Sequence, residues 1–348
     1  MLMAQARYAI AGQPVTHSLS PLLFGLVVAN LEKFKGRVDF KFASSSLHLI
    51  ETKTIEDALG WSYSEATPRV CNWEYTGVQF GKFRTETLVS KAIAHAVEVE
   101  DCEAMLVSNF DSMIDLTSGA YNLYLEQAVK QNLPTNVLEN EVFLNLTSPL
   151  KHQLSSDAVS AVDDSMKIQS VNSLRWDGRS WWCAGVDGLG IVSLANHFGI
   201  FAEKGAVLGL CGGGGAARST ANAWINAGGR VRTFLGKRKL ELPTKTEFDA
   251  SSDPLDMAVN FDDTPCMSDD FLACTFQINP SYARFEADLQ TRFESLHSQP
   301  LDGRWMLVAQ HLEAWKCLWA PQYAQLLPSV GLLLTQLVHA ENLLESYT

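Results

Sequence analysis

The sequence lacks the features that mark several large classes of protein. None of its seven cysteines forms a CxxC pair, its eight histidines form no HExxH motif, and no apolar run is long enough to span a bilayer. Lysine and arginine number 27 against 39 acidic residues, which gives a net charge of −12. We therefore expect no metal site, no membrane span and no broad nucleic-acid interface.

The bulk composition is that of a globular protein. The chain has 348 residues, of which 47% are hydrophobic and 19% are charged, and this is enough for two domains with separate cores. An odd number of scattered cysteines predicts reduced, mostly buried thiols. The first residues, MLMAQARYAI, do not have the pattern of a signal peptide. We expect a cytoplasmic protein, monomeric or homodimeric.

The N-terminal part alternates strand and helix patterns. RYAIAG (7–12) predicts a strand, and the helix after it is expected to take Ser18 or Ser20 as its N-cap. VFLNLTSPLK (142–151) predicts another strand followed by a turn, because proline removes an N–H group and keeps its predecessor extended. Residues from about 50 to 140 mix helical patterns with aromatic-rich pieces.

A β-α-β unit is predicted between about residues 205 and 236. AVLGLC has the pattern of a short buried strand, AARSTANAWINA that of a helix closed by Gly228 and Gly229, and RVRTFL that of the next strand. Further strands are expected from PLDMAVNF and DFLACTFQI, and helices from about residue 299 onward. The predicted fold class is α/β.

The glycine-rich turn of this unit predicts a dinucleotide site. A strand leads directly into Gly212, Gly213, Gly214, Gly215 and Ala216, which matches the context of a GxGxx(G/A) turn. Such a turn lets the backbone approach a pyrophosphate, and the N-terminus of the next helix offers free N–H groups to it. A turn of an α/β fold that binds no ligand fits the same pattern.

The end of the following strand indicates which nucleotide is bound. A cofactor with a free ribose 2′-OH usually meets an acid there, whereas this chain has Gly236, Lys237, Arg238 and Lys239. The basic run suits a 2′-phosphate, so NADP is expected rather than NAD. A solvated basic turn is the alternative.

Several motifs occur in one order along the chain. They are GQPVTHSLSP (12–21), NLTSPLK (145–151), VNSL (171–174) followed by GVDGLG (185–190), GGGGAAR (212–218) and MLVAQ (306–310). This set resembles the shikimate dehydrogenase family, which typically shows G-x-P-x-x-H-S-x-S-P, N-x-T-x-P-x-K, V-N-T, N-T-D-G-x-G, G-x-G-G-A-A-R and a late glutamine. The resemblance covers nearly the whole chain except about 50–140.

The resemblance implies a domain organisation and a reaction. A substrate-binding and catalytic domain would comprise residues 1–187, with an insertion at about 50–140, and be completed by 300–348. An NADP-binding Rossmann domain would comprise 188–299. The implied reaction interconverts a ring ketone and an alcohol of a small cyclic carboxylate, as in 3-dehydroshikimate and shikimate or a relative such as quinate.

The resemblance also implies residues that contact the substrate. Ser18 and Ser20 would hold its carboxylate, and Thr147, Asn172 and Gln310 would bind its ring hydroxyls. Ordinary structural explanations stand beside these roles: the serines would cap a helix, the asparagine would satisfy a turn, and the glutamine would be a buried polar residue of a helix.

Lys151 and Asp187 would form the catalytic pair of the implied reaction. A carbonyl that takes up hydride becomes an alkoxide and needs a proton donor or a fixed positive charge. An ammonium group supplies both, and an adjacent carboxylate keeps it charged. The alternatives are a solvated surface lysine and an aspartate that only caps the helix GLGIVSLANHF.

The chain departs from the family pattern at several positions. Asp187 is preceded by Gly-Val instead of Asn-Thr, V-N-T is V-N-S, and the aspartate-x-x-tyrosine-x-proline segment is TFQINP. A long insertion precedes NLTSPLK, and its aromatic residues are expected to form a small core of their own rather than a ligand surface (Trp61, Tyr63, Trp73 and Tyr75). These departures leave a second hypothesis open, a catalytically silent metabolite sensor or regulatory protein.

Overall fold

The protein is described by a computed structural model that divides into two compact units. Unit 1 comprises Met1–Asp163, Val171–Ala184 and Ala314–Thr348, and unit 2 comprises Asp164–Ser170 and Gly185–Glu313. The fold class is α/β, as predicted, whereas the proposed domain limits at 187 and 300 stay predictions. The structure describes residues 4–34, 40–41, 47–63, 74–75, 78–79, 82–99, 122–136, 141–155, 157–243, 246, 248–262, 264–283, 285 and 287–346.

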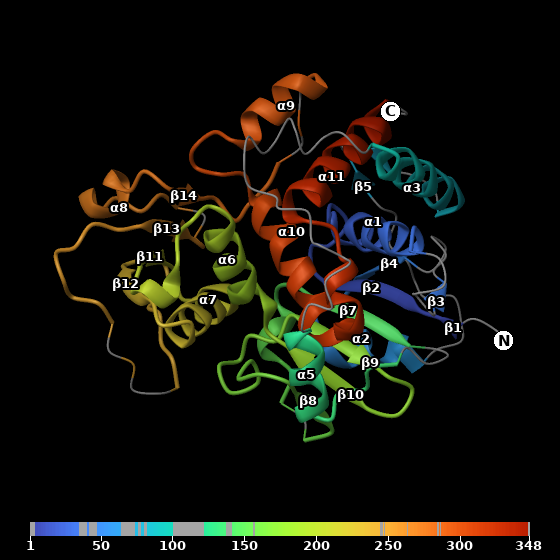
Figure 1. The fold of residues 1–348 in the computed structure, drawn as a ribbon, viewed down its shortest axis with the longest axis horizontal. Helices are drawn as coiled ribbons and strands as arrows, with labels where there is room; N and C mark the ends of the chain where they lie inside the picture. Colours follow the sequence, from blue (N-terminus) through green and yellow to red (C-terminus); the bar gives the residue numbers. More distant parts are fainter. Residues whose placement is uncertain are drawn as a thin grey trace. The chain divides into compact units, whose positions relative to one another are not determined.

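Unit 1 is built on a six-stranded mixed sheet (Figure 1). The neighbouring strands β4, β2 and β7 are parallel, and β9 pairs antiparallel with β7. The predicted strands at 7–12 and 142–146 are confirmed. The strand order is β4 (Leu47–Glu51), β2 (Arg7–Gly12), β7 (Val142–Leu146), β9 (Ser173–Trp176), β10 (Trp181–Ala184) and β8 (Val159–Ala161).

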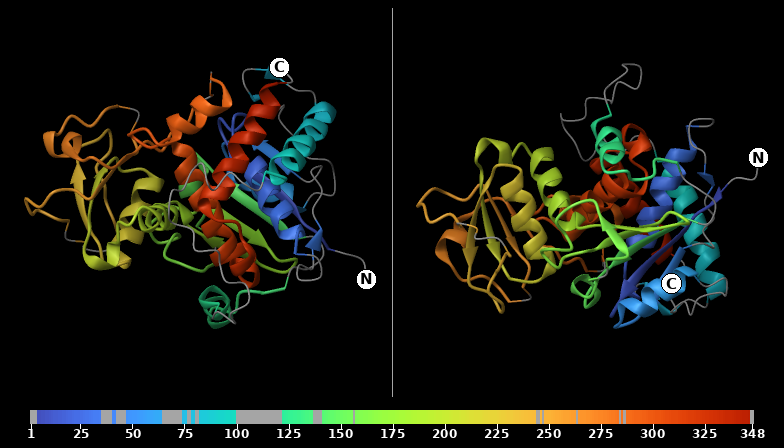
Figure 2. Two further views of the ribbon diagram at one scale, coloured as in Figure 1. Left: turned by 45° about the horizontal axis from the view of Figure 1, so that its top comes forward. Right: turned by 90° about the horizontal axis from the view of Figure 1, so that it is seen from below.

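Three helices from distant parts of the sequence lie side by side in unit 1 (Figures 1 and 2). They are α1 (Ser20–Glu32), α3 (Lys82–Val97) and α11 (Val330–Glu345). The Asn30 amide of α1 donates to Gln336 Oε1 of α11 over 2.6 Å, and both side chains are buried. The end of the chain therefore completes the packing around its beginning.

The insertion packs onto the sheet of unit 1. Trp61 in α2 (Ile55–Tyr63) is buried, and its ring lies edge-on against a histidine of β4. Tyr63 accepts a hydrogen bond of 2.6 Å from Trp181 Nε1 of β10. The expectation of a separate aromatic core is therefore wrong for Trp61 and Tyr63, while the side chains of Trp73 and Tyr75 lie outside the described part.

The remaining elements of unit 1 are short. The strand pairs β1 with β3 and β5 with β6 each form a small ribbon. After β7 the chain makes a 3-10 turn, η2, and the C-terminal segment makes a π-turn, η4, and a 3-10 turn, η5. The bounds are β1 Ala4–Gln5, β3 Phe40–Lys41, β5 Glu74–Tyr75, β6 Val78–Gln79, α5 Leu123–Lys130, η2 Leu150–His152, η4 Trp315–Trp319 and η5 Pro321–Leu326.

Unit 2 contains the predicted β-α-β unit. Its four parallel strands stand in the order β12, β11, β13, β14, and the helix α7 connects β11 to β12. The bounds of these elements are β11 Val207–Cys211, α7 Gly215–Asn226, β12 Arg230–Phe234, β13 Met257–Asn260 and β14 Gln277–Ile278.

One expected strand of unit 2 is largely a helix. In DFLACTFQI, the first residues form α8 (Asp269–Ala273), and only Gln277–Ile278 form a strand. Asp269 and Asp270 lie in the first turn of α8, where negative charge favours a helix. The other helices of unit 2 are α6 (Val186–His197), η3 (Ala202–Lys204), α9 (Leu289–Leu296) and α10 (Gly303–Ala314). None of the described helices is long and apolar enough to cross a membrane.

A fully buried ion pair ties several segments of unit 1 together. Arg175 of β9 binds both carboxylate oxygens of Glu141 over 2.9 Å, and neither side chain is exposed. The same guanidinium donates to the carbonyls of Pro134, Asn136 and Leu318. The ion pair thus joins the start of β7, the loop before it and the C-terminal segment.

Replacing Glu141 by Gln is expected to leave the Arg175 charge buried without its counter-ion. We predict a loss of about 3–5 kcal/mol in the free energy of unfolding, measured by urea denaturation. The double variant Glu141→Leu, Arg175→Met removes both charges and should recover much of that loss. Lys130→Gln breaks an exposed pair with Glu126 and serves as the control with little effect. Equal stability of E141Q and K130Q would contradict this prediction.

Candidate functional site

Three of the motif segments meet at one edge of the sheet in unit 1. Because β2 and β7 are parallel and β9 runs antiparallel to β7, the ends of β2 and β7 and the start of β9 share an edge. Thr147 N donates to Ala11 O over 2.9 Å, and Leu146 N donates to Asn172 O over 2.8 Å. A Cβ on Gly12 would lie only 2.3 Å from the Thr147 methyl group. GQPVTHSLSP, NLTSPLK and VNSL are thus brought together.

Ser18 and Ser20 are both buried at the start of α1, at 5% and 4% exposure. The N-cap is neither of them but Leu19, which already has helical dihedral angles, so the predicted N-cap is wrong. Ser18 Oγ accepts a hydrogen bond of 3.2 Å from Ser20 N. Ser20 is therefore the first residue of the helix that follows β2, and Ser18 lies just before its N-cap.

Lys151 lies in the turn η2, directly after the predicted Ser148-Pro149 break. Its side chain is partly exposed, as is that of Thr147, whose carbonyl accepts from Leu150 N over 2.9 Å. Asn172 is 3% exposed, and its backbone N–H donates to Ala184 O. The described positions of Thr147, Lys151 and Asn172 all belong to the same edge of the sheet.

Asn145 was not among the predicted site residues, yet it organises this edge. Its side-chain oxygen accepts from Tyr8 Oη over 2.6 Å, and its amide donates to Ser173 Oγ over 2.9 Å and to Asn172 O over 3.2 Å. The amide thus fixes β2, β7 and β9 relative to one another. Its position as the first residue of the motif NLTSPLK could have indicated this role from the sequence.

Asp187 occupies the first turn of α6 in unit 2. The N-cap of this helix is Gly185, so the alternative role of Asp187 as the N-cap is excluded. The residue is 1% exposed, and a carboxylate at this end of a helix is favoured by the helix dipole. Gly188 N donates to Ser219 Oγ over 3.0 Å, and that hydroxyl donates to Gly185 O, so α7 holds this turn in place.

The glycines that follow Asp187 allow very close helix packing. A Cβ on Gly188 would lie 2.1 Å from Ser219 O of α7, and one on Gly190 would lie 2.7 Å from Gln310 N of α10. Gln310 is only partly buried, unlike its neighbours on α10. Asp187 and Gln310 are therefore positioned by helices that touch. Lys151 belongs to the other unit, and its pairing with Asp187 stays a prediction.

The glycine turn has the geometry that a dinucleotide requires. Gly212 has a φ of +108°, which side chains rarely adopt, and Gly214 is the N-cap of α7. No atom lies within 4 Å of the position of a Cβ on Gly214, so the N-terminus of α7 can be approached closely there. Ala217 is fully buried against the sheet side of the helix. These residues fit a bound pyrophosphate.

The basic loop after β12 lies directly on this turn. A Cβ on Gly213 would be 2.3 Å from Lys239 O and 2.8 Å from Arg238 O, so only glycine lets the loop come this close. The side chains of Lys237 and Arg238 are exposed. Burial, followed by the nearby charge of Arg238, lowers the pKa of Arg218. Two guanidinium groups thus lie near each other beside the glycine turn.

The carboxylate of Asp262, which was not among the predicted site residues, also lies beside the basic loop. Asp262, which follows β13, accepts a hydrogen bond from Lys237 N with its Oδ2. The same oxygen lies 2.0 Å from where a Cβ on Gly236 would be. The sequence carried no signal for this contact, because Asp262 is remote from Lys237 in the chain and is brought to it by the pairing of β13 with β11.

A pocket opens at the carboxyl ends of β13 and β14, with a volume of about 450 Å³. Asn260, Asp262, Thr264 and Cys266 are among the residues that line it. The strand order reverses between β11 and β13, and ligands of parallel α/β sheets bind at such a reversal. Asp262 lines this pocket and also lies beside Gly212, so the pocket and the glycine turn are neighbours in unit 2.

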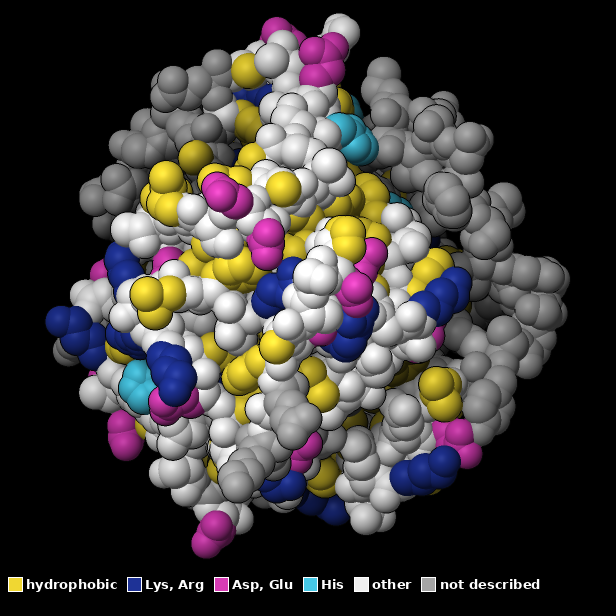
Figure 3. All heavy atoms as spheres, turned by 90° about the vertical axis from the view of Figure 1, so that its left-hand side faces the viewer, with side chains coloured by type: hydrophobic (Ala, Val, Ile, Leu, Met, Phe, Trp, Pro, Cys, Tyr) yellow, Lys and Arg dark blue, Asp and Glu magenta, His cyan; other side chains and the backbone are white. Residues whose placement is uncertain are grey.

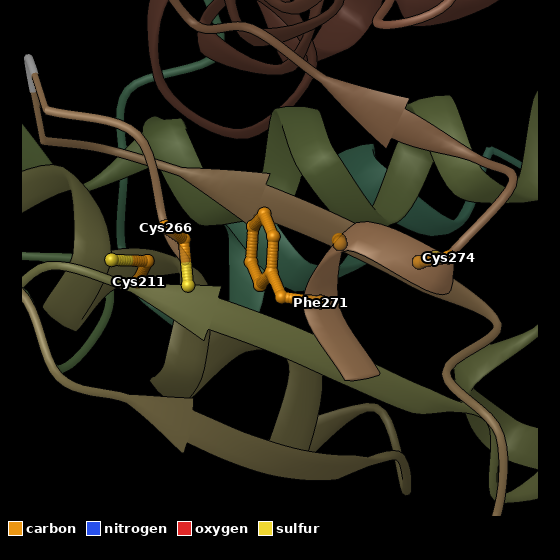
Figure 4. Close-up of a cluster of buried hydrophobic side chains, with 5 residues drawn as sticks. Cys211, Cys266, Phe271 and Cys274 are labelled. Carbon is orange, nitrogen blue, oxygen red and sulfur yellow. The ribbon is translucent and has the colours of Figure 1, made fainter. Parts of the chain in front are cut away.

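Cys211 and Cys266 lie beside each other under this site (Figure 4). Burial, with smaller contributions from Cys266 and Asp262, raises the pKa of Cys211 to about 12. The thiol therefore stays protonated and serves packing. All five described cysteines are free and four are buried, as predicted, and the described residues contain no cluster suited to a metal ion.

Basic and acidic side chains are interspersed on the face of the molecule in Figure 3. With a net charge of −12, this face gives no broad positive field. An anionic ligand would therefore depend on a local site, such as a helix N-terminus or the cations beside the glycine turn.

Comparison with known proteins shows the fold. No protein-family model matches the chain, and no curated protein matches it. Among solved structures, the shikimate 5-dehydrogenase of Thermus thermophilus in complex with shikimate is 18% identical, with a TM-score of 0.50 over 97% of this chain and 99% of that one. A shikimate dehydrogenase in complex with NADP+ is 14% identical, with a TM-score of 0.50 over 97% and 98%. The chain thus has the fold of shikimate dehydrogenases.

The same fold occurs within a larger protein of S. pombe, which combines dehydroquinate dehydratase and shikimate dehydrogenase. There the TM-score is 0.50 at 13% identity, and the match covers 97% of this chain and 53% of that one. The resemblance stated from the sequence motifs is therefore confirmed at the level of the fold.

Replacing Gly214 by Ala tests the open approach to the turn. Because nothing surrounds the new methyl group, the melting temperature should stay unchanged, while the affinity for a nicotinamide dinucleotide is expected to fall about tenfold or more. Gly213→Ala is the matched variant, in which the methyl group collides with the basic loop, so its melting temperature should fall as well. Calorimetric binding and thermal unfolding give both quantities. An unchanged affinity in G214A would contradict the assignment of the turn.

Buried His311, the neighbour of Gln310 on α10, should make stability depend on pH. Burial lowers the pKa of His311 to about 3, whereas in the unfolded chain it is near 6.5. Between these values only the unfolded state binds the proton, so the free energy of unfolding should fall as pH falls, by up to about 1.4 kcal/mol per unit. Urea denaturation from pH 7 to pH 4 measures this slope. His311→Gln should flatten it, and an equally steep slope in the variant would contradict the prediction.

Proposed function

We propose that the protein is an NADP-dependent oxidoreductase that interconverts a ring ketone and an alcohol of a shikimate-like cyclic hydroxy acid. The observation that carries the proposal is the meeting of GQPVTHSLSP, NLTSPLK and VNSL at one edge of the sheet in unit 1. These segments match family motifs, and they lie together within the fold of shikimate dehydrogenases.

The substrate carboxylate is assigned to Ser18 and Ser20. Both serines flank the N-cap of α1, and a helix N-terminus favours an anion despite the acidic chain. Thr147, Asn172 and Gln310 are assigned to the ring hydroxyls, because hydroxyl and amide groups donate and accept hydrogen bonds. A polyhydroxylated cyclic carboxylate is the class of ligand that satisfies these groups together.

The cofactor is assigned to unit 2. The glycine turn and the N-terminus of α7 would hold the pyrophosphate, and Lys237 and Arg238 would hold the 2′-phosphate of NADP. When bound, NADP supplies or accepts the hydride of the reaction. The pocket at the ends of β13 and β14 is the part of the same site that lies away from β12.

Lys151 and Asp187 are assigned to proton transfer at the reacting oxygen. The ammonium group of Lys151 would donate a proton to the oxygen of the ring carbonyl during reduction and take it back during oxidation. The carboxylate of Asp187 would keep that ammonium group charged and oriented. Gly185 and Val186 replace the Asn-Thr of the family pattern, but the aspartate itself is retained. The negative charge of the proposed pair is therefore still supplied by Asp187.

The proposal is tested by NADPH formation with a panel of shikimate, quinate and related cyclic hydroxy acids. Lys151→Ala and Asp187→Asn are expected to lower kcat by about 10²–10⁴-fold with NADP affinity retained. Lys130→Ala, an exposed lysine on α5, is the control with unchanged turnover. Binding is measured by calorimetry alongside the rates.

Two results would reject parts of the proposal. Turnover that survives in both K151A and D187N would remove these two residues from the mechanism and leave the oxidoreductase activity in place. Ligand-induced thermal shifts without NADPH formation across the panel would favour the alternative function, a catalytically silent metabolite sensor with the same fold.

A further inference from the structure

We propose that Asp262 is a specificity-determining residue of the dinucleotide site. Its carboxylate lowers the ratio of NADP affinity to NAD affinity, so that NAD binds as well. This inference rests on the cofactor assigned under the proposed function. It concerns a residue that neither the glycine motif nor the basic run includes.

The position of Asp262 supports this role. In many dinucleotide folds the acid that binds the ribose 2′-OH stands at the end of the strand after the glycine turn. Here that strand is β12, and a loop with a glycine and basic residues follows it. Asp262 reaches the same place from β13: its Oδ2 accepts from Lys237 N and touches Gly236, and its Oδ1 lies 3.2 Å from where a Cβ on Gly212 would be.

The carboxylate is held in this position by its own turn. Asp262 N donates to Asn260 Oδ1 over 3.0 Å, and the Asn260 amide donates to Thr264 O over 2.8 Å. Asp262 is partly exposed and lines the pocket at the end of β13. Its side chain is thus fixed by the backbone on both sides, with acceptor capacity left toward the pocket.

Opposing charges therefore meet at the ribose end of the site. A 2′-phosphate would be attracted by Lys237 and Arg238 and repelled by Asp262, because charges at a partly exposed site are only partly screened. A free 2′-OH would instead donate a hydrogen bond to the carboxylate. The cations of the basic loop favour the phosphate, and the carboxylate of Asp262 opposes it.

The substitution Asp262→Asn removes the negative charge of the side chain but keeps its hydrogen bond to the basic loop. The amide oxygen of asparagine can still accept from Lys237 N, so the basic loop keeps its place while the negative charge is lost. Asp269→Asn removes an equal charge from the exposed surface of α8 and is the matched control. The double variant Lys237→Ala, Arg238→Ala removes the opposing charges.

Binding of NADP+ and NAD+ to the purified protein is measured by calorimetry, together with adenosine 2′,5′-bisphosphate and adenosine 5′-monophosphate as fragments. We expect D262N to raise the ratio of NADP to NAD affinity about tenfold, with the fragments following the same trend. D269N should leave the ratio unchanged, and the double lysine and arginine variant should lower it.

An unchanged ratio in D262N, or an equal loss of both affinities, would overturn the role in selectivity and leave Asp262 as an anchor of the loop. A wild-type protein that binds neither dinucleotide would overturn the proposed cofactor and, with it, this inference. The two failures are distinguished by the wild-type measurement alone.

Discussion

The close contact between Gly12 and Thr147 is the constraint on which the candidate substrate site depends. It occurs where β2 and β7 end side by side, and a side chain on Gly12 would collide with the threonine methyl group. The contact fixes the directions in which two motif segments leave the sheet. Because β9 starts at the same edge, Asn172 joins them without any further bend of the chain. The Asn145 amide, bonded to Tyr8, Ser173 and the Asn172 carbonyl, secures that arrangement.

Glycines also allow close approaches in unit 2, where they bring helices together. Gly188 and Gly190 bring α6 against α7 and α10, which positions Asp187 and the backbone of Gln310. At the glycine turn, Gly213 lies against the backbone of the basic loop and Gly214 faces open space. Glycines of one motif therefore differ in their surroundings: some lie against neighbouring backbone, and others leave space at the helix N-terminus.

Local patterns predicted the elements of the fold well. The strand, glycine turn, helix and strand between residues 207 and 234 follow from periodicity and from turn residues, which act over a few positions. The failures occurred where such patterns compete. DFLACTFQI is apolar enough for a strand, but its acidic start favours a helix, and α1 takes Leu19 as its N-cap despite two adjacent serines. The aromatic residues Trp61 and Tyr63 suggested a separate core and instead pack onto distant strands.

The sequence by itself determined the fold class, the glycine turn, the basic run and the identities of the candidate site residues, because each depends on residues that are close in the chain. Only the tertiary structure decided which of those residues share an edge of a sheet, that Asn145 joins three strands, and that Asp262 reaches the end of β12. These contacts depend on the order and direction of strand pairing. Residues 25 or more positions apart in the chain are brought together by that pairing, and no local pattern records it.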